Sequence, residues 1–513
     1  MNLATLLRQQ AAAQPDRIAL RAGGQTLTWA EWDARTDAAA YGLLALRLPT
    51  AGGHAARVAI ALPNTVEFAV ALTAVLRAGL IAVPGNPGLT PRELRHVLSD
   101  SGAEVLLAQS ELLAGVAGAV PHALTELPTA AATGGLPETG DDEIALLLYT
   151  SGTEGAPKGA MLPHRALLAN HRQLAALEPP LLGADDTVLL ALPLFHAYGL
   201  NTGLGSVLWH GATGVLVPDF DPAGTAAAIE AHAVTVVVGV PQMFLAWSAL
   251  PDARARLATV RLAVCGAAAL EPAAATRFTQ LTGIAVQVGY GLTETAPVLA
   301  ATVAAPAAKP GSIGRPLPGV ELRLVNAAGE DVWRGGSALL EDDDDPDDEA
   351  PDLAVPDSPG TDPGEIVVRG DNLFLGYWPD GRGGPDADGW WPTRDVAYAD
   401  GDGDLFLVDR LGELILVSGF NVYPAEVEQV LLAHPGVAQA AVLAAPHPLT
   451  GQQVRAIVVP RQRGGEVAEL TEAELAAHCA RNLARFKCPA RIEFARELPL
   501  SVIGKVRKSL LRE

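Results

Sequence analysis

The chain has 513 residues, 49% of them hydrophobic, and a formal net charge of -22 at pH 7. This length exceeds what one hydrophobic core usually serves, so we expect two or more domains. The charge disfavours nucleic acid and anionic membranes as partners, and the lack of a secretory signal and of an apolar run of about eighteen residues predicts a cytoplasmic protein without a membrane span.

The first part of the chain alternates between helical and strand-like segments. Up to residue 140 we expect helices over 3–13, 29–46 and 65–78, and strands over 18–21, 58–62 and 81–83. The same alternation resumes with short apolar runs at 187–192, 213–217, 234–240, 261–265 and 284–288. This pattern predicts parallel or mixed sheets with helices on both faces, in which ligands bind beyond the carboxyl ends of the strands.

Between these two parts lies an apolar strand, 144–148, that ends in a loop of glycines and hydroxyls. The loop reads Thr150, Ser151, Gly152, Thr153, Glu154, Gly155, Ala156, Pro157, Lys158, Gly159. Backbone N–H groups, hydroxyls and one ammonium can bind an anion, so the loop is a candidate phosphate site. It is not the common nucleotide P-loop, because Gly159 stands where that motif has the Mg²⁺-binding hydroxyl. On composition alone, an ordinary turn is an equally good interpretation.

After Pro310 the pattern changes to short β segments separated by turns, which predicts a small antiparallel subdomain. Residues 341–362 interrupt it with eleven carboxylates and no basic residue, so we expect a solvated, disordered insertion there. A separate αβ pattern begins near residue 411. We therefore predict an N-terminal domain over 1–410 and a small α+β domain over 411–513.

Four further stretches contain residues that could bind a nucleotide or a metal ion or take part in catalysis. The turn 289–294 offers the Tyr290 ring to a base and the Glu294 carboxylate to Mg²⁺. Asp395 could accept ribose hydroxyls, although surface turns look similar. His196 lies between two aromatic residues, where a half-buried structural histidine is the simpler interpretation. Lys505 follows a glycine near the C-terminus; the chain has only five lysines beside 31 arginines, so a retained lysine suggests a specific role.

Together, in this order, the motifs resemble the adenylate-forming superfamily, which includes acyl-CoA synthetases, aryl-CoA ligases, amino-acid adenylation domains and luciferases. The stretches that carry the resemblance are TLTWAEWDART, YTSGTEGAPKGAMLPH, VGYGLTE, TRD, DRLGELILVSGFNVYPAEVE and SVIGKVRK. They span nearly the whole chain. The resemblance implies a large N-terminal domain, built from two αβ sheets and a small antiparallel β subdomain, and a mobile C-terminal α+β domain.

The resemblance also implies roles for individual residues. Mg²⁺ would be held by Glu294, and Lys505 would contact the carboxylate and the α-phosphate. The predicted catalytic residues are Lys505, Glu294, Thr150 and His196. The predicted nucleotide-binding residues are Thr150, Ser151, Gly152, Thr153, Lys158, Gly266, Ala267, Ala268, Tyr290, Thr293, Asp395 and Arg410. ATP, Mg²⁺ and coenzyme A are the implied cofactor and co-substrates. In the second step the thiol of CoA would attack the acyl-adenylate after the C-terminal domain rotates.

Two features depart from the family's pattern. The rotation commonly pivots on a Lys or Asp two residues after the arginine of the DR pair, and here that position is Gly412. Glycine adopts either hinge conformation at little steric cost but favours neither. The acidic insertion at 341–362 is the second departure, since related sequences have a short turn there.

The predicted substrate is a hydrophobic carboxylic acid. His196 stands where amino-acid adenylation domains usually have an aspartate, which argues against an α-amino acid. The resemblance is greatest to bacterial fatty-acyl and aryl-CoA ligases, and we expect a fatty acid ahead of an aryl acid. The candidate pocket residues are mostly apolar: Phe195, Tyr198, Val240, Met243, Phe244, Gly289 and Ala296. Two alternatives remain open: a ligase that loads an acyl carrier protein, and a non-catalytic scaffold of the same fold.

Overall fold

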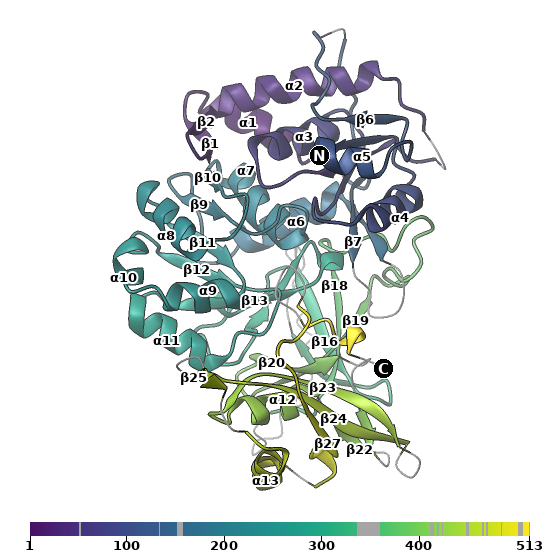
Figure 1. Ribbon diagram of the computed structural model, residues 1–513. Coiled ribbons are helices and arrows are strands. Elements are labelled where there is room, and N and C mark those ends of the chain that lie inside the picture. Colours follow the sequence, from purple (N-terminus) through teal and green to yellow (C-terminus); the bar gives the residue numbers. More distant parts are fainter. Residues whose placement is uncertain are drawn as a thin grey trace, which may run out of the picture. The chain divides into compact units, whose positions relative to one another are not determined.

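The computed structural model describes residues 1–50, 53–132, 134–150, 157–335, 360–410, 415–417, 420–422, 424–447, 451–463, 466–467, 470–483, 485–500 and 506–511 (Figure 1). The chain divides into two compact units. Unit 1 contains Met1–Glu321 and Arg369–Trp391, and unit 2 contains Leu322–Gly335, the described part of Pro346–Val368, and Pro392–Glu513. Among these described residues, no helix is both long enough and apolar enough to cross a membrane.

Unit 1 contains a six-stranded sheet in which all pairs but one are parallel. Its central strands are short continuous apolar runs that are buried on both faces, as expected when helices cover both sides. The exception is the antiparallel pair of the last two strands, which form a hairpin. The order of strands is β6 (His122–Leu124), β5 (Val105–Ala108), β3 (Arg57–Ala61), β4 (Ile81–Pro84), β7 (Ile144–Thr150) and β8 (Lys158–Pro163).

A nine-stranded sheet forms the rest of the core of unit 1. Its inner strands are parallel, and antiparallel strands complete both edges. The order is β15 (Arg315–Pro316), β14 (Val298–Ala301), β13 (Val286–Gly291), β12 (Leu262–Cys265), β11 (Val236–Gly239), β9 (Thr187–Leu190), β10 (Thr213–Leu216), β1 (Ile18–Ala22) and β2 (Gln25–Thr28).

Four helices of unit 1, α2, α3, α4 and α8, begin at a residue whose side chain caps the helix. In α4, the Thr90 hydroxyl and the Glu93 carboxylate form a capping box, Pro91 starts the helix, and Gly102 ends it with a positive φ of 61°. The α-helices of the unit are α1 (Thr5–Ala13), α2 (Trp29–Ala45), α3 (Val66–Arg77), α4 (Pro91–Ser101), α5 (Ser110–Gly115), α6 (His164–Ala175), α7 (Ser206–His210), α8 (Pro222–Ala231), α9 (Pro241–Ser248), α10 (Ala253–Arg256) and α11 (Pro272–Thr282).

Unit 2 contains most of a five-stranded sheet and the C-terminal αβ segment. The sheet runs β17 (Asp331–Gly335), β16 (Val320–Val325), β18 (Gly364–Gly370), β19 (Trp391–Ala399) and β20 (Leu405–Arg410), and the pair at each edge is antiparallel. The strands of the C-terminal sheet are β22 (Phe420–Val422), β21 (Ile415–Val417), β24 (Gly451–Pro460), β23 (Val437–His447) and β27 (Arg491–Phe494), and a short pair, β25 (Gln462–Arg463) and β26 (Glu466–Val467), is separate from it.

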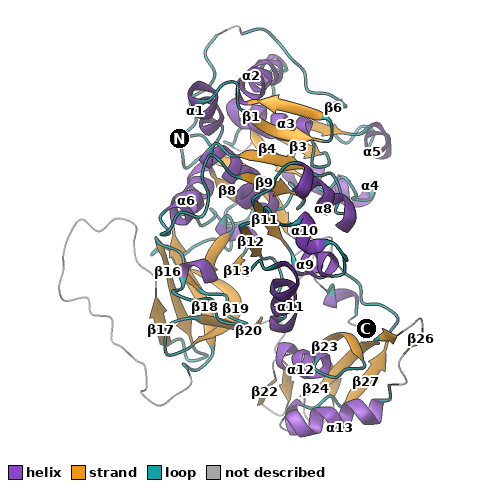
Figure 2. Ribbon diagram, turned by 90° about the vertical axis from the view of Figure 1, so that its left-hand side faces the viewer, coloured by secondary structure: helices purple, strands orange, loops and turns teal. Residues whose placement is uncertain are grey.

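The C-terminal sheet has its own hydrophobic core. Figure 2 shows α12 (Pro424–Leu432) and α13 (Glu472–Asn482) on one side of these strands. Val427, Leu431, Leu475 and Cys479 pack there against buried strand residues. The mixed α/β fold class predicted from the sequence is thereby confirmed. The predicted boundary near Arg410 stays a prediction.

Candidate active site

The glycine- and hydroxyl-rich loop connects the two strands of a hairpin. Thr150, at the end of β7, lies opposite Lys158, at the start of β8. Ser151, Gly152 and Thr153 lie outside the described residues. The apolar part of β7 is fully buried, so the polar residues begin where the strand leaves the core. The structure therefore describes both ends of the candidate phosphate loop.

Both ends of the loop are bonded to helix α4. Before the loop, the Tyr149 hydroxyl donates to Asp100 Oδ2 at 2.6 Å. After the loop, His96 Nε2 lies 3.3 Å from the carbonyl oxygen of Pro157. Burial raises the pKa of Tyr149 far above its usual value, so the phenol stays protonated and remains a hydrogen-bond donor. Helix α4 thus holds the residues at both ends of the loop, a contact that the sequence did not reveal.

Glu294 lies in the short 3₁₀ turn Thr293–Thr295 that follows β13, and its side chain is buried. The Tyr377 hydroxyl donates to Glu294 Oε1 at 2.6 Å, and the Phe374 N–H donates to the Glu294 carbonyl at 2.9 Å. The same tyrosine presents its ring to Lys158, whose Nζ lies 5.5 Å from the ring centroid. Tyr377 thus contacts two predicted site residues that are distant in sequence.

The backbone after Glu294 is held by buried amide side chains. The carbonyl of Thr295 accepts from Asn372 Nδ2 at 2.8 Å, and that of Ala296 accepts from Asn201 Nδ2 at 2.7 Å. Asn170 bonds both the carbonyl and the N–H of Val298. Successive backbone groups are therefore fixed by different elements, which restricts how far the turn carrying Glu294 can move.

Residues predicted to flank adenine lie at the carboxyl edge of two neighbouring parallel strands. Gly266, Ala267 and Ala268 follow β12, and Tyr290 lies in the adjacent strand β13. A Cβ atom at Gly266 would lie 2.9 Å from Cζ of Tyr198, whose ring covers this glycine. Any larger residue at position 266 would require the Tyr198 ring to shift. This edge is where ligands bind in such sheets.

His196 precedes a π-helix over Tyr198–Gly205, an element that the apolar and glycine residues of this stretch did not indicate. The His196 ring lies 4.7 Å from the Phe195 ring, and its main-chain carbonyl accepts from Leu200. π-Helical segments are frequent at functional sites. No described contact assigns His196 a catalytic part, and that role stays a prediction.

In unit 2, Asp395 on β19 lies opposite Arg410 on β20. Asp395 is buried, and its N–H donates to the Thr393 hydroxyl at 3.1 Å. The preceding Arg394 has a positive φ of 65° and donates its N–H to Glu365. The side chain of Arg410 lies outside the described part of the chain. Thr393, Arg394 and Asp395 therefore lie within strand β19 and not in a surface turn.

Lys505, Gly412 and residues 341–359 of the acidic insertion also lie outside the described residues. The chain on both sides of Lys505 is described. Leu500 and Val506 form a β-bridge, and Lys508 Nζ lies 2.9 Å from Glu428 Oε1 of α12. The described residues that flank 501–505 are thus bonded to each other and to α12.

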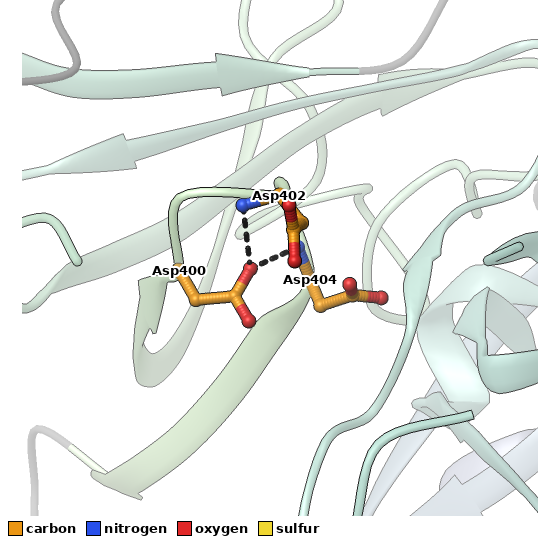
Figure 3. Close-up of side chains that lie close together, drawn as sticks. All are labelled: Asp400, Asp402 and Asp404. Carbon is orange, nitrogen blue, oxygen red and sulfur yellow. Dashed lines mark hydrogen bonds between the residues drawn. The ribbon is translucent and has the colours of Figure 1, made fainter. Parts of the chain in front are cut away.

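A cluster of carboxylates lies in the turn between β19 and β20 (Figure 3). One carboxylate oxygen from each of Asp400, Asp402 and Asp404 lies within 4.8 Å of the others. Asp400 Oδ1 accepts the N–H groups of Asp402 and Asp404, both at 3.0 Å. These bonds are typical of an Asx-type turn. We assign no ion to this cluster.

The residues present fit the groups that the site is predicted to hold. The Glu294 carboxylate supplies hard oxygen ligands, and Mg²⁺ in nucleotide sites is usually bound by one or two carboxylates together with phosphates. Lys158 is exposed at the end of the loop, where its ammonium can reach an anion. Gly266 lies directly against an aromatic ring at a strand end. This combination is compatible with a nucleotide-binding site in an α/β enzyme.

Comparison with known proteins identifies the family. A family model described as "AMP-binding enzyme" matches residues 7–378, and one described as "AMP-binding enzyme C-terminal domain" matches residues 426–505. The chain belongs to the AMP-binding enzyme family. Its class is that of adenylate-forming acid–thiol ligases, which use ATP, Mg²⁺ and CoA.

Individual relatives match nearly the full length of the chain. A feruloyl-CoA synthase from an Amycolatopsis species is 37% identical over 98% of this chain and 97% of its own length. A long-chain-fatty-acid–CoA ligase from Escherichia coli O157:H7 is 33% identical over 100% of this chain and 94% of its own length. The crystal structure of ATP-bound MatB from Rhodopseudomonas palustris has a TM-score of 0.86 at 29% identity and covers 100% of this chain and 98% of its own.

Proposed function

We propose that the chain is an ATP-dependent acyl-CoA ligase that activates a hydrophobic carboxylic acid as an acyl-adenylate and transfers the acyl group to CoA. The observation that carries this proposal is the contact of Tyr377 with both Glu294 and Lys158. A nucleoside triphosphate bound as its Mg²⁺ complex needs a carboxylate for the metal and an ammonium for the phosphates, and Glu294 and Lys158 offer these groups on the same tyrosine. The family membership supports the same reaction.

The chemistry explains why these charges are needed. When a carboxylate attacks an α-phosphate, two anions approach each other, and positive charge along the line of attack stabilises the transition state. We propose that Lys158 and Thr150 bind phosphate oxygens, that Glu294 holds Mg²⁺, and that Lys505 contacts the reacting carboxylate. Asp395 would bind the ribose hydroxyls.

For the acid, a fatty acid is our first candidate, because the pocket candidates are mostly apolar and the chain is 33% identical to a long-chain-fatty-acid–CoA ligase. An aryl acid is the second candidate, and two observations favour it: the 37% identity with a feruloyl-CoA synthase, and the Tyr198 ring that lies against Gly266 and fills space there. Phe244 belongs to a buried aromatic cluster with Trp247 and Phe278, so it is better explained as a core residue.

Thioester formation over acids of graded chain length and aromaticity tests the proposal and the substrate class together. We expect AMP, pyrophosphate and a CoA thioester, with the fastest turnover on fatty acids. Fastest turnover on hydroxycinnamic or benzoic acids would establish the second candidate. Acyl-AMP without thioester at saturating CoA would instead indicate an acyl-carrier-protein acceptor. No ATP–pyrophosphate exchange with any acid would favour the non-catalytic scaffold.

A further inference from the structure

We propose that Tyr377 is a positioning residue that orients Glu294 for Mg²⁺, guides Lys158 toward the nucleotide phosphates, and keeps these two charges from pairing with each other. This inference rests on the proposed function, since it takes the roles of Glu294 and Lys158 from it. Tyr377 did not emerge from the sequence, where it is far from both residues.

The hydroxyl of Tyr377 fixes one oxygen of the metal-binding carboxylate. Its distance to Glu294 Oε1, 2.6 Å, is typical of an O–H donor on a charged carboxylate, a strong type of hydrogen bond. The Glu294 side chain is buried, and its carbonyl accepts from the Phe374 N–H. With the main chain and Oε1 both fixed, the direction of Oε2 is set before a cation arrives. A preorganised ligand binds its cation at a smaller entropic cost.

The ring of Tyr377 acts on the second charge. Lys158 is exposed and has a flexible four-carbon stem, so it would sample many positions on its own. Its Nζ lies 5.5 Å from the ring centroid, within the range of a cation–π contact. The Tyr377 hydroxyl therefore binds the Glu294 carboxylate, while the ring attracts the Lys158 ammonium. A direct Glu294–Lys158 ion pair would occupy both groups, and a nucleotide would have to break it.

The backbone holds Tyr377 next to Lys158. Strand β8, which begins at Lys158, exchanges hydrogen bonds with the segment 375–378: Leu375 N–H donates to the Met161 carbonyl, and Met161 N–H donates to the Gly376 carbonyl. Trp378 N–H donates to the Gly159 carbonyl at 2.8 Å. The Phe374 ring packs edge-on against the Tyr377 ring at a centroid distance of 5.1 Å. The tyrosine thus stands on a rigid part of unit 1.

Two substitutions separate the two contacts. Tyr377→Phe removes the hydroxyl and keeps the ring, whereas Tyr377→Leu removes both. Tyr41→Phe is the matched control, because the Tyr41 hydroxyl also donates a single hydrogen bond, to the Gly134 carbonyl at 2.7 Å, at an exposed site of the same unit. Calorimetric titration with ATP, in Mg²⁺ and separately in EDTA, measures binding without turnover.

We expect Mg²⁺ to tighten ATP binding in the wild type and in Tyr41→Phe. In Tyr377→Phe this gain falls by roughly ten-fold, which corresponds to about 1.4 kcal/mol, while affinity in EDTA stays within about two-fold. In Tyr377→Leu affinity in EDTA falls as well, by about three-fold, because Lys158 loses the ring. In a Glu294→Gln background, Tyr377→Phe should add no further loss of the Mg²⁺ gain, since the tyrosine acts through Glu294.

The outcomes are distinguishable from failure of the proposed function. Wild-type protein that does not bind ATP in either buffer would overturn both. Wild-type protein that binds ATP with a Mg²⁺ gain, beside a Tyr377→Phe variant with the same gain, would overturn the role of Tyr377 alone. An equal loss in Mg²⁺ and in EDTA, or the same loss in the Glu294→Gln background, would show a structural role instead. Tyr377→Phe changes no volume beyond one oxygen, so it carries the test if Tyr377→Leu does not fold.

Discussion

Asn201 offers the sharpest test of how unit 1 holds the turn that follows Glu294. This fully buried amide donates to the Leu167 and Ala296 carbonyls at 3.2 and 2.7 Å, and its Oδ1 lies 2.9 Å from His171 Nε2. Because the amide nitrogen serves two carbonyls, Oδ1 accepts and the histidine donates through Nε2. Asn201→Ala removes three hydrogen bonds at once and leaves their partners buried.

The expected loss follows from the number of bonds. A neutral hydrogen bond contributes about 1 kcal/mol, so Asn201→Ala should lower the free energy of unfolding of unit 1 by about 3 kcal/mol. The control is Asn64→Ala. Asn64 is equally buried, donates to the Leu190 and Leu192 carbonyls, and accepts from the Leu194 N–H, so it loses the same number of bonds elsewhere.

Hydrogen exchange read by mass spectrometry distinguishes the two variants. Both should unfold at lower urea concentration. Only Asn201→Ala should speed exchange in peptides covering 292–300 and weaken the Mg²⁺-dependent binding of ATP. If Asn201→Ala leaves exchange in these peptides unchanged, or if Asn64→Ala accelerates it equally, the turn is not held by this amide and the reasoning is wrong.

Three further predictions concern other parts of the chain. Asp100→Asn weakens the hydrogen bond that the Tyr149 hydroxyl donates to Asp100. Because Asp100 is exposed, we expect steady-state kinetics to show only a three- to five-fold rise in KM for ATP, about 1 kcal/mol, with kcat unchanged. Lys505→Ala should nearly abolish adenylation but spare thioester formation from supplied acyl-adenylate; equal loss of both half-reactions would contradict its role. Burial lowers the pKa of His171 to about 4, below its ordinary 6.5. Between these two pH values the unfolded chain binds more protons than the folded chain, so the free energy of unfolding should fall as the pH drops from 6.5 to about 4. His171→Gln should flatten that part of a urea-midpoint profile.

The fold was predictable where a pattern is local. The helix 29–46 is found as Trp29–Ala45, because a capping threonine and a run of helix formers mark it. The strand expected over 58–62 is found at Arg57–Ala61. The π-helix Tyr198–Gly205 was missed, because its apolar and glycine residues fit a loop or a helix equally well and the close approach of Gly199 to the Pro193 carbonyl depends on tertiary contacts.

The candidate site was predictable only through its motifs. Glu294 and Lys158 stand in recognisable stretches, but Tyr377 lies in neither, and only the pairing of its segment with β8 brings it to them. Asp100 was missed for the same reason. Asp100 can bond Tyr149 only because the fold places α4 beside the β7–β8 hairpin. Such contacts depend on long-range packing, which periodicity and composition do not encode.

Gly159 links these observations. In the sequence it excludes the common P-loop, because no hydroxyl follows Lys158 to hold Mg²⁺. The structure adds a steric reason: a Cβ at this position would lie 3.2 Å from the Tyr149 ring, whose hydroxyl anchors the hairpin to α4. In a P-loop this position holds a metal ligand. Here the glycine leaves room for the Tyr149 ring, which anchors the hairpin to α4. The proposed ligand, Glu294, follows a strand of the other sheet of unit 1, so the proposed binding of metal and phosphates would depend on how that sheet is held against β8. Tyr377 and the buried amides supply contacts between the two.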